Sequence, residues 1–283
     1  MEKNLTIYES NQRQKIGFFA IWMKMFRNIL KSKELIYQLF RRDFFMAYKK
    51  SFLGFWWIAL SPIVGIASWV FLNVSGILKA GDVGIPYPAY VLLSSSIWGL
   101  FMGFYSSASG TLTAGAGIIT QVKYPHEALL AKQTAQHLAG FIVTFIINII
   151  VLIVFRVIPS PLIFLFPVLI LPLFFLGAGM GLIVSVISSV ATDVEKIVSI
   201  LLGLVFFATP VIYAKSSMNP IFQKFVDWNP LTYLIGGVRD AIIYGKIEFL
   251  DRFLLVGLAS LIFFMLSWRL FYVSEDKVIE KMI

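Results

Sequence analysis

Six long apolar stretches dominate the sequence of this 283-residue chain. A transmembrane helix needs about 20 mainly apolar residues to cross a hydrocarbon core about 30 Å thick. The stretches do not alternate apolar and polar residues with period two, which excludes the pattern of a transmembrane β-barrel. Charged residues make up only 14% of the chain, whereas a soluble domain carries about 25%. The sequence therefore predicts an all-α integral membrane protein with six transmembrane helices, near residues 53–78, 89–111, 133–156, 162–187, 197–213 and 252–271.

The basic residues predict how the chain sits in the membrane. An even number of spans places both termini on one side, and that side then carries 17 Lys and Arg residues against seven on the other. The positive-inside rule assigns the richer side to the cytoplasm. The net charge of +9 is therefore attributed to orientation signals and lipid-headgroup contacts rather than to a nucleic-acid surface. We expect a multi-pass protein with both termini cytoplasmic, membrane lipids as partners and no nucleic acid.

Residues 1–52 are expected to form a cytoplasmic amphipathic arm ahead of the transmembrane domain, residues 53–283. The stretch 16–30 places basic and apolar residues on different helical faces, a pattern typical of a helix lying in the headgroup plane. A second amphipathic stretch contains Arg41 and Arg42. It is either a simple basic anchor or a site that recruits an anionic lipid-linked group, because arginine presents a fork of donors that suits a diphosphate.

Two Asn-Pro pairs, at Asn219 and Asn229, mark the segment between the fifth and sixth spans. Asn is a good N-cap and Pro is favoured at the first helical position, so each pair predicts a short helix, of about eight and about 15 residues. Both helices are too short to cross a membrane. We expect a re-entrant hairpin over residues 219–245 that dips into the outer leaflet, with an ordinary external loop as the alternative. Irregular backbone at such depth must be shielded by protein or face a water-lined cavity, which makes the hairpin a candidate gate.

Aromatic residues make up 16% of the chain. Many of them fit the aromatic belt at the two membrane interfaces. Others should lie deeper, where rings could stack against sugar rings along a carbohydrate pathway. The candidates for such a channel are Trp57, Trp69, Trp98, Tyr105 and Phe206.

Several catalytic patterns are missing from the sequence. The stretch 110–117, GTLTAGAG, lacks the Lys-Ser/Thr that a Walker A loop needs to hold phosphate and magnesium, so we do not expect the chain to hydrolyse ATP itself. No metal-ligand cluster is present, and His126 and His137 stand alone. The predicted spans contain no internal Asp or Glu, which disfavours an ion-coupled carrier. The pairs Gly99/Gly103 and Gly177/Gly181 have the small-xxx-small spacing of close helix packing.

Four stretches form one pattern along the chain. They are LFRRDFFMAYKKSFLGFWWIALSP (39–62), VKYPHEALL (122–130), DVEKIVSILLGLVFFATPVIY (193–213) and NPLTYLIGGVRDAII (229–243). Together they resemble the membrane subunit of polysaccharide-exporting ABC transporters, the ABC-2-type permeases that export O-antigen, capsular polysaccharide or teichoic acid. His126 stands where that family often has Arg, but the neighbouring Pro and Glu are retained.

The resemblance implies a homodimer bound to two copies of a cytoplasmic ABC ATPase subunit, in the inner membrane of a bacterium. ATP and Mg²⁺ would bind to that partner, and this chain would hold no cofactor or metal. The implied substrate is a polysaccharide linked to a polyprenyl diphosphate, with O-antigen as the first expectation.

The resemblance also assigns roles to three groups of residues. The polar loop after the second span becomes a short coupling helix that faces the ATPase, through Lys123, Tyr124, Pro125, His126 and Glu127. A solvated loop is the alternative. The lipid diphosphate would be loaded by Arg41, Arg42, Lys49 and Lys50. The external gate would consist of Asn229, Pro230, Tyr233 and Arg239.

Three other functions are compatible with parts of the sequence. An ion-coupled secondary carrier would act without an ATPase. A membrane glycosyltransferase would need paired loop carboxylates, whereas Asp82, Asp227 and Asp240 are scattered. An ABC-2 permease for teichoic acid, capsule, a drug or a small lipid would share the same broad fold.

Overall fold

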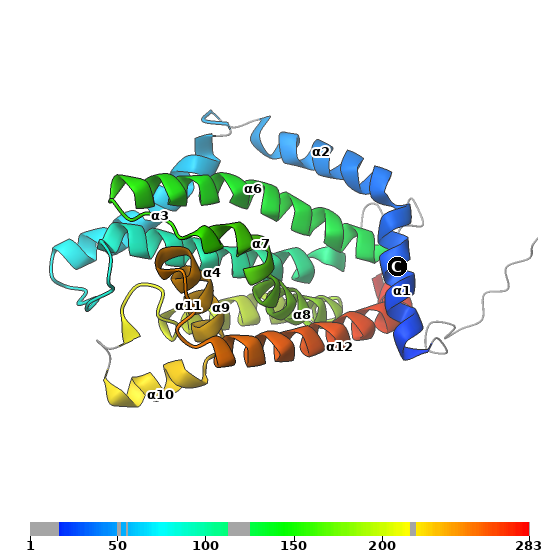
Figure 1. Cartoon of the computed structure of the whole chain (residues 1–283). Helices are drawn as coiled ribbons and strands as arrows, with labels where there is room; N and C mark the ends of the chain where they lie inside the picture. The colour runs from blue at the N-terminus through cyan, green and yellow to red at the C-terminus, as the bar shows by residue number, and fades with distance from the viewer. Residues whose placement is uncertain (1–16, 50–51, 55, 113–124, 216–218, 283) are drawn as a thin grey trace, which may run out of the picture.

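The computed structural model is a bundle of helices, with no strand among the residues described. Those residues are 17–49, 52–54, 56–112, 125–215 and 219–282. Most long helices run in a similar direction, while α1 (Phe18–Lys31) lies crosswise at one end of the bundle (Figure 1). We call this end the α1 end. The opposite end, which holds α10 (Pro220–Trp228), is the hairpin end.

Within the described residues, five helical segments are long and apolar enough to cross a membrane. They confirm the predicted helical membrane fold, although their bounds differ from the predicted spans by several residues. The five are α3 (Trp56–Val74), α4 (Tyr87–Ser109), α6 (His126–Val154), the run of η1 (Pro161–Leu165), α7 (Phe166–Leu169) and α8 (Leu171–Ser188), and the apolar part of α12 (Leu250–Met282).

The remaining predicted span, 197–213, is helical over only part of its length. α9 covers Asp193–Phe207, which is 15 residues, whereas a crossing helix needs about 20. The chain leaves the helix at Ala208, two residues before Pro210. Proline has no N–H to donate, and its ring clashes with the preceding helical turn. A sixth crossing therefore stays a prediction.

α4 is the central helix of the bundle, and 16 of its 23 residues are buried. It packs against α3, α6 and α8, and α12 packs on the far side of α8. Gly181 allows α8 to lie directly on α4, because a Cβ at this position would stand 2.4 Å from the carbonyl oxygen of Tyr105. Gly177 approaches the carbonyl oxygen of Phe101 in the same way. This is the close approach that small residues four apart permit.

The N-terminal arm is packed onto the α1 end of the bundle. Ile21 and Met25 of α1 are buried against Tyr272 of α12. α2 (Lys33–Lys49) follows α1 after Ser32 and packs along α6. The crosswise direction of α1 is the one that a helix in the headgroup plane would take if the bundle spans the membrane.

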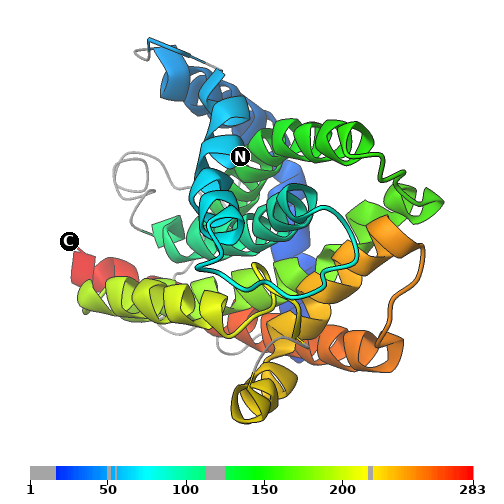
Figure 2. The ribbon, with the colours of Figure 1, turned by 90° about the vertical axis from the view of Figure 1, so that its left-hand side faces the viewer.

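The two Asn-Pro pairs begin helices, as predicted. Asn219 caps α10 by accepting a hydrogen bond from the Ile221 N–H, at 3.0 Å, and α10 has nine residues. Asn229 caps α11 (Pro230–Tyr244) in the same way, and α11 has 15 residues. α11 packs into the bundle, whereas most of α10 is exposed (Figure 2). Whether this hairpin enters the membrane stays a prediction.

Candidate functional site

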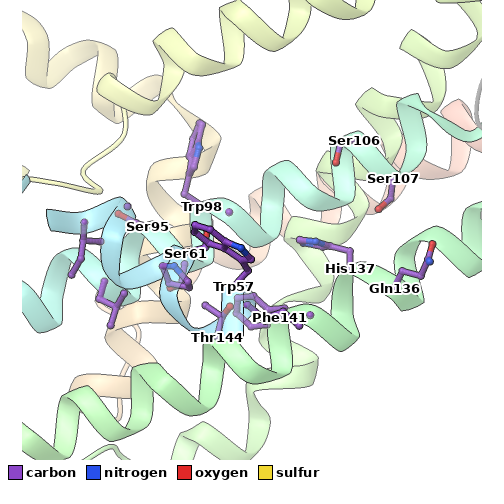
Figure 3. A pocket seen from close by; sticks show the side chains of 18 of the residues that line it. Trp57, Ser61, Ser95, Trp98, Ser106, Ser107, Gln136, His137, Phe141 and Thr144 are labelled. Carbon is purple, nitrogen blue, oxygen red and sulfur yellow. The ribbon is translucent and has the colours of Figure 1, made fainter. Parts of the chain in front are cut away.

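A cavity of about 1020 Å³ lies between α3, α4 and α6, with one side chain from α9 in its lining. It extends from the middle of the bundle toward the α1 end, since its lining includes residues near the last turn of α4 and near the start of α6. Figure 3 shows two chemically different parts. The aromatic side chains of Trp57, Trp98 and Phe141 gather in one part, interspersed with the hydroxyls of Ser61, Ser95 and Thr144. The other part contains Ser106, Ser107 and Gln136 and no labelled aromatic ring.

Four of the five predicted channel aromatics line this cavity. Trp69 and Trp98 both contact Phe206, with ring centroids 5.9 and 5.3 Å apart. Trp57 lines the cavity from the start of α3 and is about half exposed. These side chains come from three helices that are far apart in sequence, so the fold brings them together on one surface.

Tyr105, the fifth predicted channel aromatic, does not line the cavity. Its side chain is fully buried, and its hydroxyl points to the carbonyl oxygen of Glu195 in α9, at 3.5 Å. Trp98 and Tyr105 are seven residues apart and so lie on nearly the same face of α4, but Tyr105 lies two turns further along the helix, where its hydroxyl is directed at α9. The expectation that it faces the same pathway is therefore corrected.

The polar part of the cavity consists of residues that were not among the predicted site residues. Ser106 and Ser107 lie near the end of α4, and Gln136 lies in the first half of α6 (Figure 3). Gln133, also in the lining, lies three residues earlier in α6. Polar residues inside transmembrane helices usually face the protein interior or a water-filled cavity. That rule could have marked these serines and glutamines as candidates, but the pairing of α4 with α6 is needed to place them together.

His137 lies between the aromatic and polar parts (Figure 3). Its Nε2 lies 3.2 Å from the carbonyl oxygen of Leu100, so Nε2 is the nitrogen that carries the donated proton. The ring packs directly over Gly103, where a Cβ would stand 1.8 Å from the imidazole. His137, which stands alone in the sequence, is thus placed by the fold in the lining of the cavity.

Three of the predicted coupling residues, Pro125, His126 and Glu127, are described and lie at the α1 end, at the start of α6. Pro125 is the N-cap residue of α6, and His126 and Glu127 form its first turn. Both side chains are buried at 1% exposure, and Asn28 of α1 donates a hydrogen bond to Glu127 at 3.2 Å. The expectation of charged side chains facing outward from a short helix is corrected for these two residues, because Glu127 is bonded to α1 and the His126 ring lies against Phe271 of α12, with ring centroids 6.4 Å apart. Lys123 and Tyr124 lie outside the described residues.

The predicted diphosphate-loading residues lie along α2. Arg41, Arg42 and Lys49 are exposed, while Lys50 lies outside the described residues. Arg42 pairs with Asp43 at 2.7 Å. None of the three described residues lines the cavity, so their role as a loading site stays a prediction.

Asp43 also ties α2 to the transmembrane bundle. Lys132 of α6 donates to the Asp43 carboxylate at 2.8 Å, and the lysine side chain is only 10% exposed. Burial alone would raise the pKa of Asp43. The hydrogen bonds and positive charges of Arg42 and Lys132 outweigh this effect and hold the pKa of the carboxyl below its usual value.

At the hairpin end, Arg239 of α11 holds the irregular chain that follows α9. Its guanidinium donates to the Pro210 carbonyl oxygen at 3.0 Å and to the Tyr90 hydroxyl at 2.8 Å. The Tyr90 hydroxyl is also 2.9 Å from the Pro210 carbonyl oxygen and 3.0 Å from that of Tyr213. Asn229 donates to the Ala208 carbonyl oxygen at 3.1 Å. The backbone carbonyl oxygens freed at the end of α9 are thus bonded by side chains of α4 and α11. We call this set of contacts, made by Tyr90, Asn229 and Arg239, the carbonyl clasp.

The other predicted gate residues lie near this clasp. Pro230 begins α11, and the Tyr233 hydroxyl donates to the Asp227 carbonyl oxygen of α10 at 2.8 Å. Tyr233 and Arg239 also line a second pocket, of about 540 Å³, at the hairpin end. The fold therefore brings the predicted gate residues together, while a gating function stays a prediction.

The family of the chain is decided by residues 34–243, which match the family model described as ABC-2 type transporter. The chain belongs to the ABC-2 type transporter family. The matched range runs from α2 to α11 and includes the cavity, the coupling residues and the carbonyl clasp.

Relatives within the ABC-2 family have moderate identity to this chain. The O-antigen export system permease protein RfbA of Myxococcus xanthus is 26% identical over 70% of the chain and 75% of its own length. A protein of the same name from Klebsiella pneumoniae is 24% identical over 80% of the chain and 87% of its length. The polysialic acid transport protein KpsM of Escherichia coli is 23% identical over 76% and 84%.

Proposed function

We propose that this chain is the membrane subunit of an ATP-driven exporter, which moves a polyprenyl-diphosphate-linked polysaccharide, in the first instance O-antigen, from the cytoplasm across the inner membrane. The observation that carries the proposal is the cavity between α3, α4 and α6. Its tryptophans offer ring faces against which sugar rings stack, and its hydroxyl and amide groups match the hydrogen-bonding groups of sugars. Membership of the ABC-2 family and the polysaccharide-exporting relatives support the same substrate class.

The energy for export comes from ATP bound by a separate ATPase subunit. The loop that ends at Pro125 receives the motion of that subunit. Because Asn28 bonds to Glu127 and Asp43 bonds to Lys132, a displacement of the start of α6 also moves α1 and α2. The coupling residues act as a buried joint between the arm and the bundle.

The working unit is a homodimer bound to two ATPase subunits. α3 and α9 support this assembly because each has one buried residue, Ile66 and Leu202. The two helices are adjacent through the contact of Trp69 with Phe206. Apolar side chains remain exposed on both helices, so a second copy packing here would enclose a pathway between two sets of α3, α4 and α9. Lipid is the other surface that could cover them.

The experiment is an export assay in a bacterium that makes a lipid-linked O-antigen but lacks its own permease. The chain is expressed together with its ATPase subunit, and polymer on the outer side of the inner membrane is measured by adding a glycosidase to spheroplasts. We expect glycosidase-sensitive polymer only when both subunits are present. An ATPase variant without its Walker A lysine is the matched control and should leave the polymer protected.

Other outcomes identify the rival functions. Export that needs an ion gradient but no ATPase would indicate a secondary carrier. A stable complex whose ATP hydrolysis responds to a drug, a small lipid, capsule or teichoic acid, but not to O-antigen, would keep the ABC-2 assignment and change the substrate. Assembly as a dimer is tested separately by the mass of the purified complex in nanodiscs.

A further inference from the structure

The cavity has no formal charge in its lining. None of the described lining residues is Asp, Glu, Lys or Arg, and His137 is the only one among them with an ionisable side chain. The polar groups are serine and threonine hydroxyls together with the amides of Gln133 and Gln136. Such groups both donate and accept hydrogen bonds, as sugar hydroxyls do.

His137 does not supply a fixed cation to this lining. Its Nε2 proton is donated to the Leu100 carbonyl oxygen at 3.2 Å, and the ring lies edge-on to Phe104. A neutral imidazole in this position offers Nδ1 as one more acceptor. The residue thus adds hydrogen-bonding capacity of the same kind as the hydroxyls.

The nearest lysine along α6 is turned away from the cavity. Lys132 precedes Gln133, but it does not line the cavity and pairs with Asp43 of α2 at 2.8 Å. Its charge is already matched by a carboxylate on the outside of the bundle. A carboxylated sugar in the cavity would therefore be separated from water without gaining a cationic partner, which is a costly environment for a charge.

The pocket at the hairpin end does not favour anions either. Its described lining includes three carboxylates, Asp82, Asp240 and Glu248, and two cations, Lys215 and Arg239. Arg239 pairs with Asp240 at 3.1 Å, and Lys215 pairs with Asp227. The two cations are thus engaged with carboxylates, and no surplus of positive charge lines this pocket.

We propose that the cavity selects uncharged sugar units, so that the polymer exported by this chain is a neutral glycan and not a polyanionic one. This inference rests on the proposed function. The charged lipid diphosphate does not bear on this selectivity, because we assign its binding to the exposed arm and not to the cavity.

The test is a comparison of two oligosaccharides binding to the full chain in lipid nanodiscs. The probes are maltohexaose, which is neutral, and an oligogalacturonate of six residues, which carries one carboxylate per ring. Saturation-transfer NMR with titration measures both affinities, including weak ones. We expect maltohexaose to bind about tenfold or more tightly than the oligogalacturonate, a difference of about 1.4 kcal/mol.

A charge placed in the cavity should reverse this preference. Gln136 lines the cavity, and lysine has a similar unbranched aliphatic stem, so it can replace glutamine at this position (Figure 3). In Gln136→Lys we expect tighter binding of the oligogalacturonate, while the neutral Gln136→Met, of similar length, keeps the wild-type order. Ser107→Lys, at the same end of the cavity, provides a second charged variant if the first does not fold.

The possible results distinguish a failure of the proposed selectivity from a failure of the proposed function. Equal binding of both probes to the wild-type chain, or tighter binding of the oligogalacturonate, would overturn the selectivity and leave the proposed export of polysaccharide standing. If neither probe binds, the cavity is not a glycan site, and both the selectivity and the assignment of the cavity are overturned. If both lysine variants still bind maltohexaose more tightly than the oligogalacturonate, the preference does not come from this lining.

Discussion

The guanidinium of Arg239 donates to the hydroxyl of Tyr90 at 2.8 Å and lies 4.8 Å from the centroid of the same ring. This contact joins α11 to α4. Both side chains also bond to the carbonyl oxygen of Pro210, in the irregular segment after α9. A non-helical segment in a membrane protein is stable only where its polar groups are bonded or reach water. The carbonyl clasp therefore explains how α9 can end at Phe207 without leaving buried carbonyl groups unpaired.

Loss of the Tyr90 hydroxyl should destabilise the hairpin end. In Tyr90→Phe, the carbonyl oxygens of Pro210 and Tyr213 lose a donor that they share, and Arg239 loses an acceptor. We expect the folded state to lose about 1–3 kcal/mol, the cost of leaving a buried polar group unsatisfied. The measurement is the midpoint of thermal unfolding in detergent.

Tyr233→Phe is the matched control for the clasp. It also removes one tyrosine hydroxyl from the hairpin end, but its hydrogen bond to Asp227 is exposed. Its midpoint should stay near that of the wild-type protein. Equal losses in the two variants would contradict a special role for the clasp.

Gly181→Ala should weaken the packing of α8 on α4. The added Cβ would stand 2.4 Å from a backbone oxygen, which cannot rotate away as a flexible side chain could. We expect a loss of about 1–3 kcal/mol from overpacking, measured by the same thermal assay. Gly203→Ala on α9 is the control, since its Cβ meets nothing within 4 Å. A Gly181→Ala protein as stable as the Gly203→Ala protein would show that the two helices can separate at little cost.

Local sequence chemistry was sufficient to predict the two hairpin helices. The N-caps at Asn219 and Asn229 are set by a side chain and the proline that follows it. The overall membrane fold also follows from apolar runs alone. These features depend on neighbours in sequence, so no knowledge of tertiary packing was needed.

Features that depend on tertiary partners were missed or misplaced. α6 begins at His126 rather than near residue 133, because the polar residues of its first turns are bonded to α1 and α2. Hydropathy cannot detect such partners and therefore begins the span too late. The fifth predicted span runs on to residue 213 because the segment after α9 is apolar. In the structure this segment is not helical, and the clasp holds it. The polar part of the cavity needed the pairing of α4 with α6.

The pair formed by Asp43 and Lys132 predicts a pH dependence. Because the pKa of Asp43 is lowered in the folded state, the pair contributes fully above the usual value of 3.8 and is lost as pH falls through the lowered value. We expect spin labels at exposed positions Met46 and Ile142 to give one narrow distance distribution from neutral pH down to about 4. The distribution should broaden only at lower pH.

Asp43→Asn should remove this dependence. The variant lacks the ionised partner at every pH, so its distance distribution should be broad already at neutral pH. Asp193→Asn is the control, because its pair with Lys196 is exposed and lies within α9. A wild-type distribution that broadens above pH 5 would place the relevant proton on another group.

Two adjacent tryptophans allow a direct test of the aromatic lining. Trp57 lines the cavity, whereas Trp56 does not and is 72% exposed. Trp57→Leu should reduce export about fivefold, since an aromatic contact contributes about 1 kcal/mol beyond its buried area. Trp56→Leu should leave export nearly unchanged in the same assay. Equal effects would point to a shared role at the membrane surface.

Crosslinking tests directly whether the polysaccharide enters the cavity during export. A photo-crosslinking amino acid is placed at Gln136, which lines the cavity, or at Ile142, which is exposed elsewhere on α6. Cells that make the polymer and contain the ATPase subunit are irradiated, and the chain is probed for attached glycan. We expect glycan attached at position 136 and none at position 142. Glycan at neither position during active export, or equal amounts at both, would contradict the passage of the polymer through this cavity.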